Sequence, residues 1–511
     1  MNLCIGLLQY EIGWELLLNQ LGVIWECYSS EKEISPENYS VFILNTFPDK
    51  SQTALLQKYL HDGGCIFATH GCGKNINNSS TKEKYFSSLS PKKFSPFTSS
   101  TMVDIFSKGV TTSSSLLSTS QYGKGTIIHF PFDVHNAISD TRSLRKNFYF
   151  TTERLPSEVV VRVSKGEIRK LVYSSLEFLH HQKNLPFIHK WFYPKNEQTI
   201  FTFRVDSDKG NKEEITMLHN VCKKFSIPTT WFLDVKSHEP WISLFKDFHN
   251  QQQEIGIHCY EHNTYSTFEE NYQNFNKAYT ILKQHQEKIF GASAPYGTWN
   301  ESVTTAFEKI GLEYSSEFSL DYDNLPFFPI INNRFSQVLQ LPIHPMCVGS
   351  FRRARFTNND MVAYYKNFIE KNISLREPIF LYHHPTHHHW EVFENIFNHI
   401  RTKNIFTLSY HNYTEWWKKR MLMNASLSLE NETQSLKTII TNNSNECFWR
   451  ISFPSHEEAI IPLTEHINLN TVKKKPTPLP ASPPDDIERI RKFDWRHYLQ
   501  NGLDFWYRRM Q

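Results

Sequence analysis

The chain has 511 residues, of which 39% are hydrophobic and 14% aromatic, and its formal net charge is only +3. This composition excludes a largely disordered protein, and the length indicates two to four domains. Because no long basic stripe interleaves with the aromatic residues, we do not expect the chain to bind nucleic acid.

The spacing of the cysteines and the first residues of the chain indicate the cellular compartment. The eight cysteines form no Cys-x-x-Cys pair, which favours a reducing compartment. The N-terminus lacks a basic start and reaches Glu11 early, so we expect no secretory signal. No apolar run approaches the roughly twenty residues that span a bilayer. We therefore expect a cytoplasmic protein.

Residues 1–135 alternate short apolar strands with helical segments. Val41–Asn45 and Cys65–His70 are predicted to be buried strands, and the spacing of apolar residues predicts a helix at Gln52–Leu60. A further strand follows Gly123. This α/β alternation is typical of a doubly wound parallel sheet.

The order of strand, helix, Gly63-Gly64 and strand resembles the glutamine-amidotransferase-like family in its broad sense. An active member would need a nucleophilic cysteine at a strand-to-helix elbow and a later His-x-Glu pair. Cys72 could imitate the elbow, but no glutamate stands two residues after His129. We therefore expect this domain to be a non-catalytic binding or assembly module.

The next segments have a different composition. Residues 79–120 are rich in Ser, Thr and Lys, which predicts long surface loops. Residues 136–195 are predicted to form a helical linker, with the best helix at Glu167–His181.

The central domain is expected at residues 196–420, where strands, polar residues and helices follow one another. Ile200–Val205 and Pro228–Leu233 are predicted strands on either side of a helix at Glu213–Phe225, and Glu254–His258 is a third strand. Polar side chains stand directly after these strands. That placement is expected at the C-terminal mouth of an α/β barrel.

Two motifs in this domain supply side chains for one metal ion and one base. Asp206 and Asp208 follow the first strand, and His258 and His262 follow the third. A divalent ion held by one carboxylate and two imidazoles keeps positions open for water and a substrate carbonyl. The pattern predicts a hydrolytic site in which the second carboxylate takes the proton of the water.

These motifs resemble those of the polysaccharide deacetylases, also called the NodB-homology or carbohydrate esterase 4 family, over residues 196–420. The spaced pair Asp206 and Asp208 is similar to the branch of deformylases that act on lipid-linked aminosugars, and His258 and His262 match the second motif. The resemblance implies a distorted (β/α) barrel. It also implies that Asp206 is the base, while Asp208, His258 and His262 hold a divalent metal ion, with zinc as the first candidate.

The third family motif, Arg-x-Pro-x-Gly, appears with Ser293 in the place of arginine. The resemblance implies that the backbone N–H of Tyr296 serves the oxyanion and that an arginine holds Asp206. Arg204 precedes Asp206 by two residues on the same strand, so both side chains point to the same face. We expect Arg204 to supply the missing positive charge.

The last family motif places a histidine after an apolar strand, here Ile379–Leu381. The His-Pro pair that follows favours His384 over His383 as the general acid. The run His387–His389 is either an accessory metal site or a solvated loop. The fourth family motif, with aspartate and tryptophan, is not clearly present.

The resemblance implies a metal-dependent hydrolase that removes an acetyl or formyl group from the nitrogen of an aminosugar. N-acylated aminosugars, glycans and lipid-linked sugars are the candidate substrates, and the sequence does not distinguish them. Two alternatives stay open. One is a non-catalytic carbohydrate-binding protein with a degraded site. The other is a metalloprotease, because residues 258–262 also spell His-x-x-Glu-His, although their surroundings disfavour the helix this chemistry needs.

The C-terminal part carries two further predictions. Residues 421–472 alternate apolar and polar side chains, which predicts a small β element. Residues 473–511 predict a stiff Pro-rich linker followed by an amphipathic segment. Aromatic and basic residues in that segment could make peripheral contact with a membrane or dock against protein.

Overall fold

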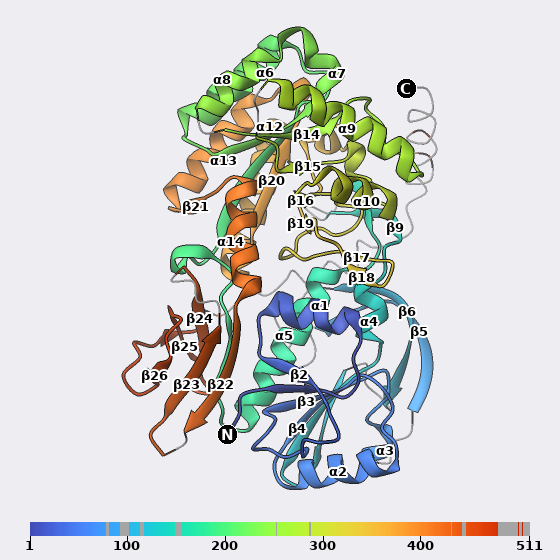
Figure 1. Cartoon of the computed structure of the whole chain (residues 1–511), viewed down its shortest axis with the longest axis vertical. Helices are drawn as coiled ribbons and strands as arrows, with labels where there is room; N and C mark the ends of the chain where they lie inside the picture. Colours follow the sequence, from blue (N-terminus) through green and yellow to red (C-terminus); the bar gives the residue numbers. More distant parts are fainter. Residues whose placement is uncertain are drawn as a thin grey trace.

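The computed structural model shows three parts (Figure 1): a central domain at the top, an N-terminal domain below it and a small β element beside that domain. The described residues are 1–77, 81–91, 102–112, 117–148, 156–251, 253–285, 288–430, 432–441, 446–478, 499 and 503. The predicted membrane-contacting segment at residues 485–511 lies outside them, apart from Leu499 and Leu503.

The N-terminal domain has a sheet with the strand order β2-β1-β3-β4-β8-β7. The pairs are parallel except β7 with β8, which is antiparallel. The strands are β1 (Ile5–Leu7), β2 (Trp25–Cys27), β3 (Val41–Leu44), β4 (Cys65–Thr69), β7 (Ser118–Tyr122) and β8 (Gly125–Phe130).

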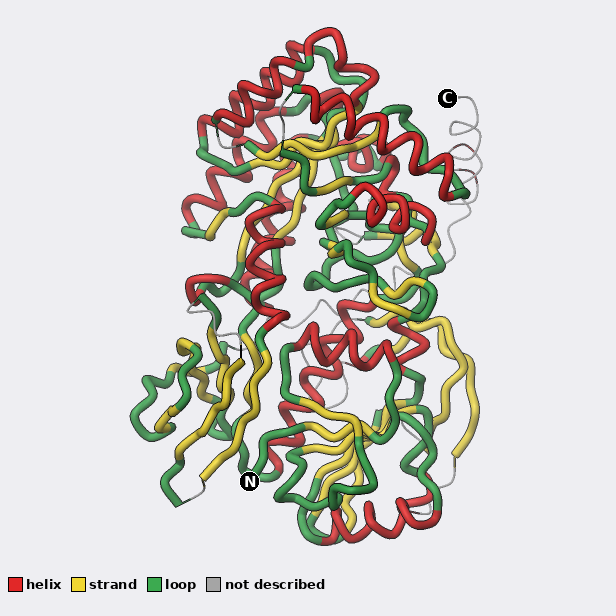
Figure 2. The backbone as a smooth tube through the Cα atoms, viewed as in Figure 1, coloured by secondary structure: helices red, strands yellow, loops and turns green. Residues whose placement is uncertain are grey.

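Helices cover both faces of this sheet (Figure 2). α1 (Ile12–Leu21) and α5 (Lys165–Gln182) pack on one face, in a core that includes Ile43 and Phe67. α2 (Lys50–His61) packs on the other face, against neighbours of these residues such as Phe42. Successive strand residues point to opposite faces, so the central strand β3 is apolar throughout and β4 is buried along its whole length. The doubly wound α/β prediction is confirmed.

The prediction of long surface loops at residues 79–120 is wrong for residues 81–89 and 103–112, while residues 79–80, 92–101 and 113–116 lie outside the described residues. β5 (Thr81–Leu89) and β6 (Val103–Thr112) form a long antiparallel hairpin instead, drawn in light blue at the edge of Figure 1. Its buried side is apolar, with Phe86 and Ile105 among the residues it contributes. Its other side carries the Ser, Thr and Lys residues that gave the segment a loop-like composition.

The predicted helical linker at 136–195 is only partly helical. α4 (Val134–Ile138) and α5 are helices, but β9 (Ser143–Asn147) pairs with β10 (Ser157–Val161), and β11 (Phe187–Lys190) pairs with a strand far along the chain. Such pairings are not visible in local periodicity.

The central domain is built on an eight-stranded parallel sheet in the order β19-β16-β15-β14-β13-β12-β20, with β21 also paired to β12. No ladder joins β19 to β20 in the described part of the chain, so the sheet is a curled, open half-barrel. The strands are β12 (Ile200–Asp206), β13 (Thr229–Asp234), β14 (Glu254–Cys259), β15 (Gly291–Ala292), β16 (Tyr314–Ser315), β19 (Leu339–Gln340), β20 (Ile379–His383) and β21 (Phe406–Thr407).

Helices surround this sheet and bury its outer face in one apolar core with residues such as Phe203, Trp231 and Phe397. They are α6 (Lys212–Lys224), α7 (Val235–His238), α8 (Ser243–Asn250), α9 (Phe268–Gln284), α10 (Glu301–Ile310), α11 (Val348–Arg353), α12 (Asn358–Leu375) and α13 (Trp390–Thr402). α14 (Tyr410–Leu422) packs instead in a separate core with Phe232 and Phe380.

The C-terminal β element consists of two small antiparallel sheets. Their shared core contains Leu436 and Trp449. The strands are β22 (Asn424–Glu430), β23 (Ser435–Thr441), β24 (Phe448–Ser452), β25 (Glu457–Pro462), β26 (His466–Asn468) and β27 (Lys475–Pro476). β11 joins this element by pairing with β24.

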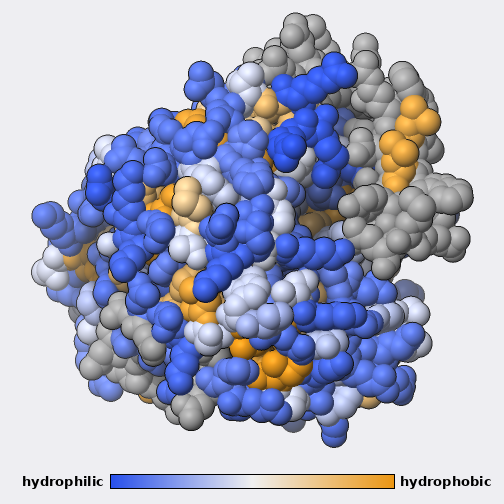
Figure 3. Space-filling view, turned by 90° about the horizontal axis from the view of Figure 1, so that it is seen from above, coloured by the Kyte–Doolittle hydropathy of each residue, from blue (hydrophilic) through white to orange (hydrophobic). Residues whose placement is uncertain are grey.

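The surface seen from above is mostly hydrophilic, with small separate hydrophobic areas (Figure 3). Among the described helices, none has the length and apolar character needed to cross a membrane. Membrane contact and a cytoplasmic location both stay predictions.

A buried cluster of charges ties the β element to the central domain. Glu458 of β25 is fully buried and accepts hydrogen bonds from Arg376, at the end of α12. It also accepts one from Nε of Arg450 at 3.0 Å. Two guanidinium groups therefore share one carboxylate away from water.

We predict that Glu458→Gln destabilises the protein by about 3–5 kcal/mol, because it removes the carboxylate of Arg376 and leaves Arg450 only its second partner, Glu177, at 3.2 Å. Urea unfolding followed by tryptophan fluorescence measures the change. The matched control is Glu446→Gln: this carboxylate lies 3.1 Å from Lys419 with its side chain 59% exposed, and surface pairs contribute about 0–1 kcal/mol. Equal effects of the two substitutions would contradict the prediction.

Candidate active site

The predicted site residues lie together at the C-terminal ends of the central strands. Asp206 is the last residue of β12, His258 lies near the end of β14, and His384 follows β20. With Asp208 and His262 they line a cavity of about 570 Å³. The cavity opens where an α/β barrel places its functional groups.

Local sequence explains how the first motif reaches this cavity. β12 ends at Asp206, and the backbone turns at Asp208 with a φ of 28°, a left-handed conformation that aspartate tolerates better than most residues. The next helix starts promptly because Asn211 caps it, accepting hydrogen bonds from the backbone N–H groups of Glu213 and Glu214.

Asp208, His258 and His262 form a triangle of the size that a metal ion requires. Oδ1 of Asp208 lies 3.1 Å from Nε2 of His258 and 3.3 Å from Nε2 of His262, and the two nitrogens are 3.2 Å apart. In a tetrahedral zinc site with bonds of about 2.0–2.1 Å, adjacent ligand atoms lie about 3.3–3.4 Å apart. The donor set fits a divalent ion with one or more open positions.

A hydrogen bond to His258 and the charges around Asp208 favour the forms of these side chains that bind metal ions. Nδ1 of His258 lies 2.6 Å from the carbonyl oxygen of Ser293; as the donor it leaves the lone pair of Nε2 for the metal. Burial alone would raise the pKa of the Asp208 carboxyl, but the imidazoles of His384, His258 and His262 hold it well below its usual range.

Arg204 holds the other aspartate of the motif. Its Nη2 donates to Oδ2 of Asp206 at 2.9 Å, and its Nη1 donates to the carbonyl oxygen of Ser316 at 2.6 Å. The guanidinium group is fully buried and lies 5.0 Å from the ring centre of Tyr382 and 5.6 Å from that of Phe232. Position 204 therefore places a positive charge beside Asp206.

One oxygen of Asp206, a residue that lines the cavity, has no partner among the described residues. Oδ2 is held by Arg204, whereas Oδ1 is buried and has no hydrogen-bond partner in the described part of the structure. A buried carboxylate oxygen without a hydrogen-bond partner destabilises the fold. Such an oxygen is suited to accept a proton from a bound water.

Sequence reasoning missed Glu317, a second carboxylate near Arg204. Its Oε1 accepts a hydrogen bond from the backbone N–H of Ala294 at 3.0 Å. Burial raises the pKa of Glu317 to about 7, although the Ala294 N–H and Arg204 act in the opposite direction. The only sequence signal is an acid two residues after the short strand β16.

The third motif forms a tight turn beside the ligands. Tyr296 has a φ of 61°, and its ring lies edge-on to His262 with centroids 4.9 Å apart. Gly297 is required next to it: its φ is 58°, and a Cβ there would come within 2.3 Å of the Phe318 ring. Ser293 is buried at the start of this loop.

His384 and His383 point to different environments. Nε2 of His384 lies 3.5 Å from Oδ2 of Asp208, on the cavity side. His383 is fully buried, packs on Phe393 with ring centroids 4.4 Å apart, and pairs through Nε2 with the carbonyl oxygen of His388 at 2.8 Å. Burial lowers the pKa of His384, but Asp208 and Cys347 raise it to about 9. This geometry favours His384 as the proton donor.

The histidine run splits between the cavity and the surface. His387 lines the cavity. His388 is 58% exposed with Nε2 3.3 Å from Glu214, and Nδ1 of His389 lies 2.7 Å from Asn358. Cys347, which the sequence analysis treated only as one of several scattered cysteines, also lines the cavity.

The protease alternative finds no support in the local geometry. β14 ends at Cys259, and the next helix begins only at Phe268, so the two histidines do not share a helix. Glu261 pairs with Lys236 at 3.1 Å, and its side chain is 53% exposed. It is therefore not placed as the base of such an enzyme.

Comparison with family models matches residues 196–315 to the polysaccharide deacetylase family. This stretch includes Asp206, Asp208, His258, His262 and Tyr296 and ends before His384. The resemblance of residues 1–135 to glutamine amidotransferases stays a prediction. No curated protein matches the chain.

Among solved structures, a probable polysaccharide deacetylase from Pseudomonas aeruginosa PAO1 is 12% identical, with 44% of this chain and 92% of that chain covered and a TM-score of 0.38. A carbohydrate esterase 4 family pseudoenzyme from Bacillus anthracis is 13% identical, with 43% and 68% covered and a TM-score of 0.31. A mutant peptidoglycan deacetylase from Bacillus subtilis is 11% identical, with 44% and 94% covered and a TM-score of 0.29.

We predict that the protein binds one divalent ion tightly through Asp208, His258 and His262, and that the double variant His258→Ala/His262→Ala loses it. Elemental analysis after dialysis against metal-free buffer measures the content. His466→Ala, at an exposed position of β26, is the control and should keep the ion. Because Cys347 lines the same cavity, the comparison is made with Cys347→Ser in both proteins, and full occupancy in the double variant would then rule out this ligand set.

We predict that Cys72→Ser leaves every activity of the protein unchanged. Cys72 is buried, and burial together with the nearby Asp133 and Glu11 raises the pKa of its thiol to about 12, so almost no thiolate is present at neutral pH. A glutaminase assay on both proteins is the measurement. Glutamine hydrolysis that disappears in the variant would show that the N-terminal domain is catalytic.

Proposed function

We propose that the polysaccharide deacetylase domain of this chain is a metal-dependent hydrolase that removes an acetyl or formyl group from the nitrogen of an aminosugar. The observation that supports this most is the three-ligand triangle with a free oxygen of Asp206 beside it. Metal ligands alone would be equally consistent with a metal-storage site or a structural metal site. A base beside the ligands is what hydrolysis needs.

The proposed reaction divides the work between named groups. A divalent ion held by Asp208, His258 and His262 would lower the pKa of a water and polarise the acyl carbonyl. Asp206 accepts the proton of the attacking water at Oδ1. His384 donates a proton to the sugar nitrogen as the carbon–nitrogen bond breaks, so that the products are an amine and a carboxylic acid.

Arg204 and the Tyr296 turn position the reacting groups. Arg204 fixes Oδ2 of Asp206, which leaves Oδ1 directed at the cavity. We assign the backbone N–H of Tyr296 to the oxyanion of the tetrahedral intermediate, where a positioned donor typically contributes about 10²–10³ in rate.

The cavity suits a hydrated, polar substrate. Polar and charged residues on its wall outside the metal triangle include Glu158, Lys209, Arg353 and Thr386. A sugar offers hydroxyl groups to such residues, and a small number of placed polar groups is what orients a ligand.

A second candidate function is a non-catalytic carbohydrate-binding protein. Ser293 in place of the family's arginine is the observation that favours it. The buried contact between Arg204 and Asp206 weakens this alternative, because it supplies the charge from another position.

We predict that purified, metal-loaded protein releases primary amine from at least one member of a panel of N-acetylated and N-formylated aminosugars and oligosaccharides. Asp206→Asn and His384→Gln should each lower turnover by about 10²–10⁴, the usual contribution of a general base or acid. The absence of amine release at full metal occupancy across the panel would favour the binding function.

We predict that Arg204→Met lowers turnover sharply while the metal content stays that of the unaltered protein, since Arg204 contacts Asp206 and none of the three ligands. Ser293→Ala is the matched control and should change turnover little. If Ser293→Ala proves the more damaging substitution, the assignment of Arg204 is wrong. Loss of metal in Arg204→Met would show a structural role instead.

A further inference from the structure

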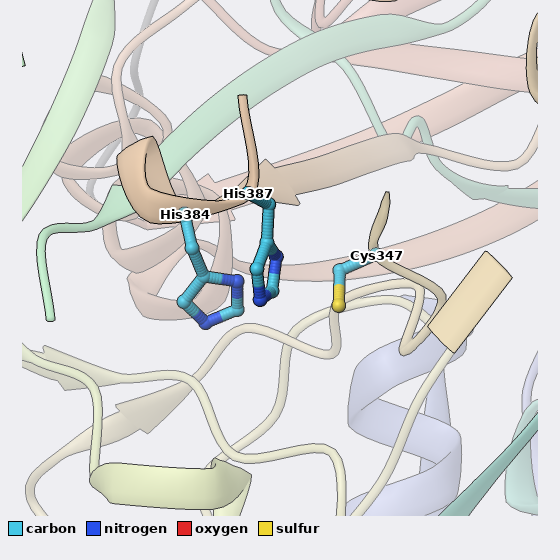
Figure 4. A group of neighbouring side chains, drawn as sticks. All are labelled: Cys347, His384 and His387. Atoms are coloured by element: carbon cyan, nitrogen blue, oxygen red, sulfur yellow. The ribbon is translucent and has the colours of Figure 1, made fainter. Parts of the chain in front are cut away.

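Three potential metal ligands outside the triangle converge on the same cavity (Figure 4). Cys347 directly precedes α11, His384 follows β20, and His387 lies in the short turn Pro385–His387. Their possible ligand atoms, one sulfur and two ring nitrogens, all lie within 4.8 Å of one another. They come from two loops that are almost forty residues apart in the sequence.

Both imidazoles have a buried nitrogen to spare. Nδ1 of His384 and Nδ1 of His387 are buried and have no hydrogen-bond partner within the described residues. The ring of His387 is held over Gly349, where a Cβ would come within 2.6 Å of it. Leaving such nitrogens without a partner is costly, and a bound cation removes that cost.

The sulfur is buried beside the two imidazoles. Cys347 is only 5% exposed. The thiolate is the form of cysteine that binds metal ions.

We propose that Cys347, His384 and His387 form a second metal site, which takes a thiophilic divalent ion such as Zn²⁺. One thiolate and two imidazoles suit zinc or cobalt and disfavour magnesium and calcium. Adjacent ligand atoms of a tetrahedral zinc ion lie about 3.3–3.7 Å apart. The three ligand atoms here lie within 4.8 Å of one another, so small side-chain rotations that bring them closer together complete the site. Three protein ligands leave a fourth position open.

The two sites meet at His384. Its Nε2 lies 3.5 Å from Oδ2 of Asp208, a ligand of the first site, while Nδ1 is the nitrogen without a partner. When Nδ1 of His384 binds a metal ion, the ring can carry a proton only on Nε2. It is then no longer the doubly protonated imidazolium that acts as the general acid. We therefore infer that the second ion inhibits the hydrolase, an inference that rests on the proposed function.

Metal binding can be tested without any substrate. The double variant His258→Ala/His262→Ala, stripped with a chelator, is titrated with Co²⁺. We expect one ion per chain and the near-ultraviolet absorption of a cobalt–thiolate bond. Cys347→Ser in the same background should lose both. Cys27→Ser and His388→Ala are controls at an exposed cysteine and an exposed histidine and should keep both signals.

A second measurement does not depend on the folding of the double variant. In excess Zn²⁺ the otherwise unaltered chain should bind two ions, and Cys347→Ser or His387→Ala should bind one. An unchanged stoichiometry in both variants, or no cobalt–thiolate absorption in the double variant, overturns the proposal.

Inhibition is tested once a substrate is found. Activity of the unaltered protein should fall when Zn²⁺ exceeds one equivalent, and Cys347→Ser should lose this dependence whatever its own rate. Cobalt–thiolate absorption without amine release from any substrate would support the second site and reject the proposed function. Two bound ions with undiminished activity would reject inhibition alone.

Discussion

A fully buried guanidinium group, that of Arg204, is the constraint on which the arrangement of the central domain depends. A charge removed from water is tolerated only when carboxylates and carbonyls surround it closely. Asp206, the Ser316 carbonyl and two aromatic faces do this here, and Glu317 lies near by. The same contacts fix which way the Asp206 carboxylate points, so the interaction that stabilises the interior of the half-barrel also orients the base.

The sequence was sufficient where a local rule applies. Apolar runs located the central strands. His258 and His262 were predicted as ligands from their three-residue gap together with the aspartates before them and the Pro295–Gly297 loop after them, and their Nε2 atoms lie 3.2 Å apart. The position of Arg204 opposite Asp206 followed from the two-residue period of a strand.

Features that depend on distant contacts could not be predicted in this way. The β5–β6 hairpin has one polar face, so its composition is that of a loop. Cys347 has no local pattern that marks it, because it reaches the cavity only through the path of the chain before α11. Glu317 shows the same limit, since its partners come from β12 and from the turn near Ser293. Side chains gathered from several strand ends form a site only after the sheet has closed around them.

The pairing of β11 with β24 has a consequence for synthesis of the chain. Phe187–Lys190 leads into the half-barrel, yet its partner Phe448–Ser452 lies more than 250 residues further on. At roughly 5–20 residues per second, β11 waits on the order of 12–50 s on the ribosome with an unpaired edge. Unpaired edges recruit other strands, so a nascent chain of this protein depends on chaperones, or on rapid docking of α5 against the N-terminal sheet, until its own C-terminal strands emerge.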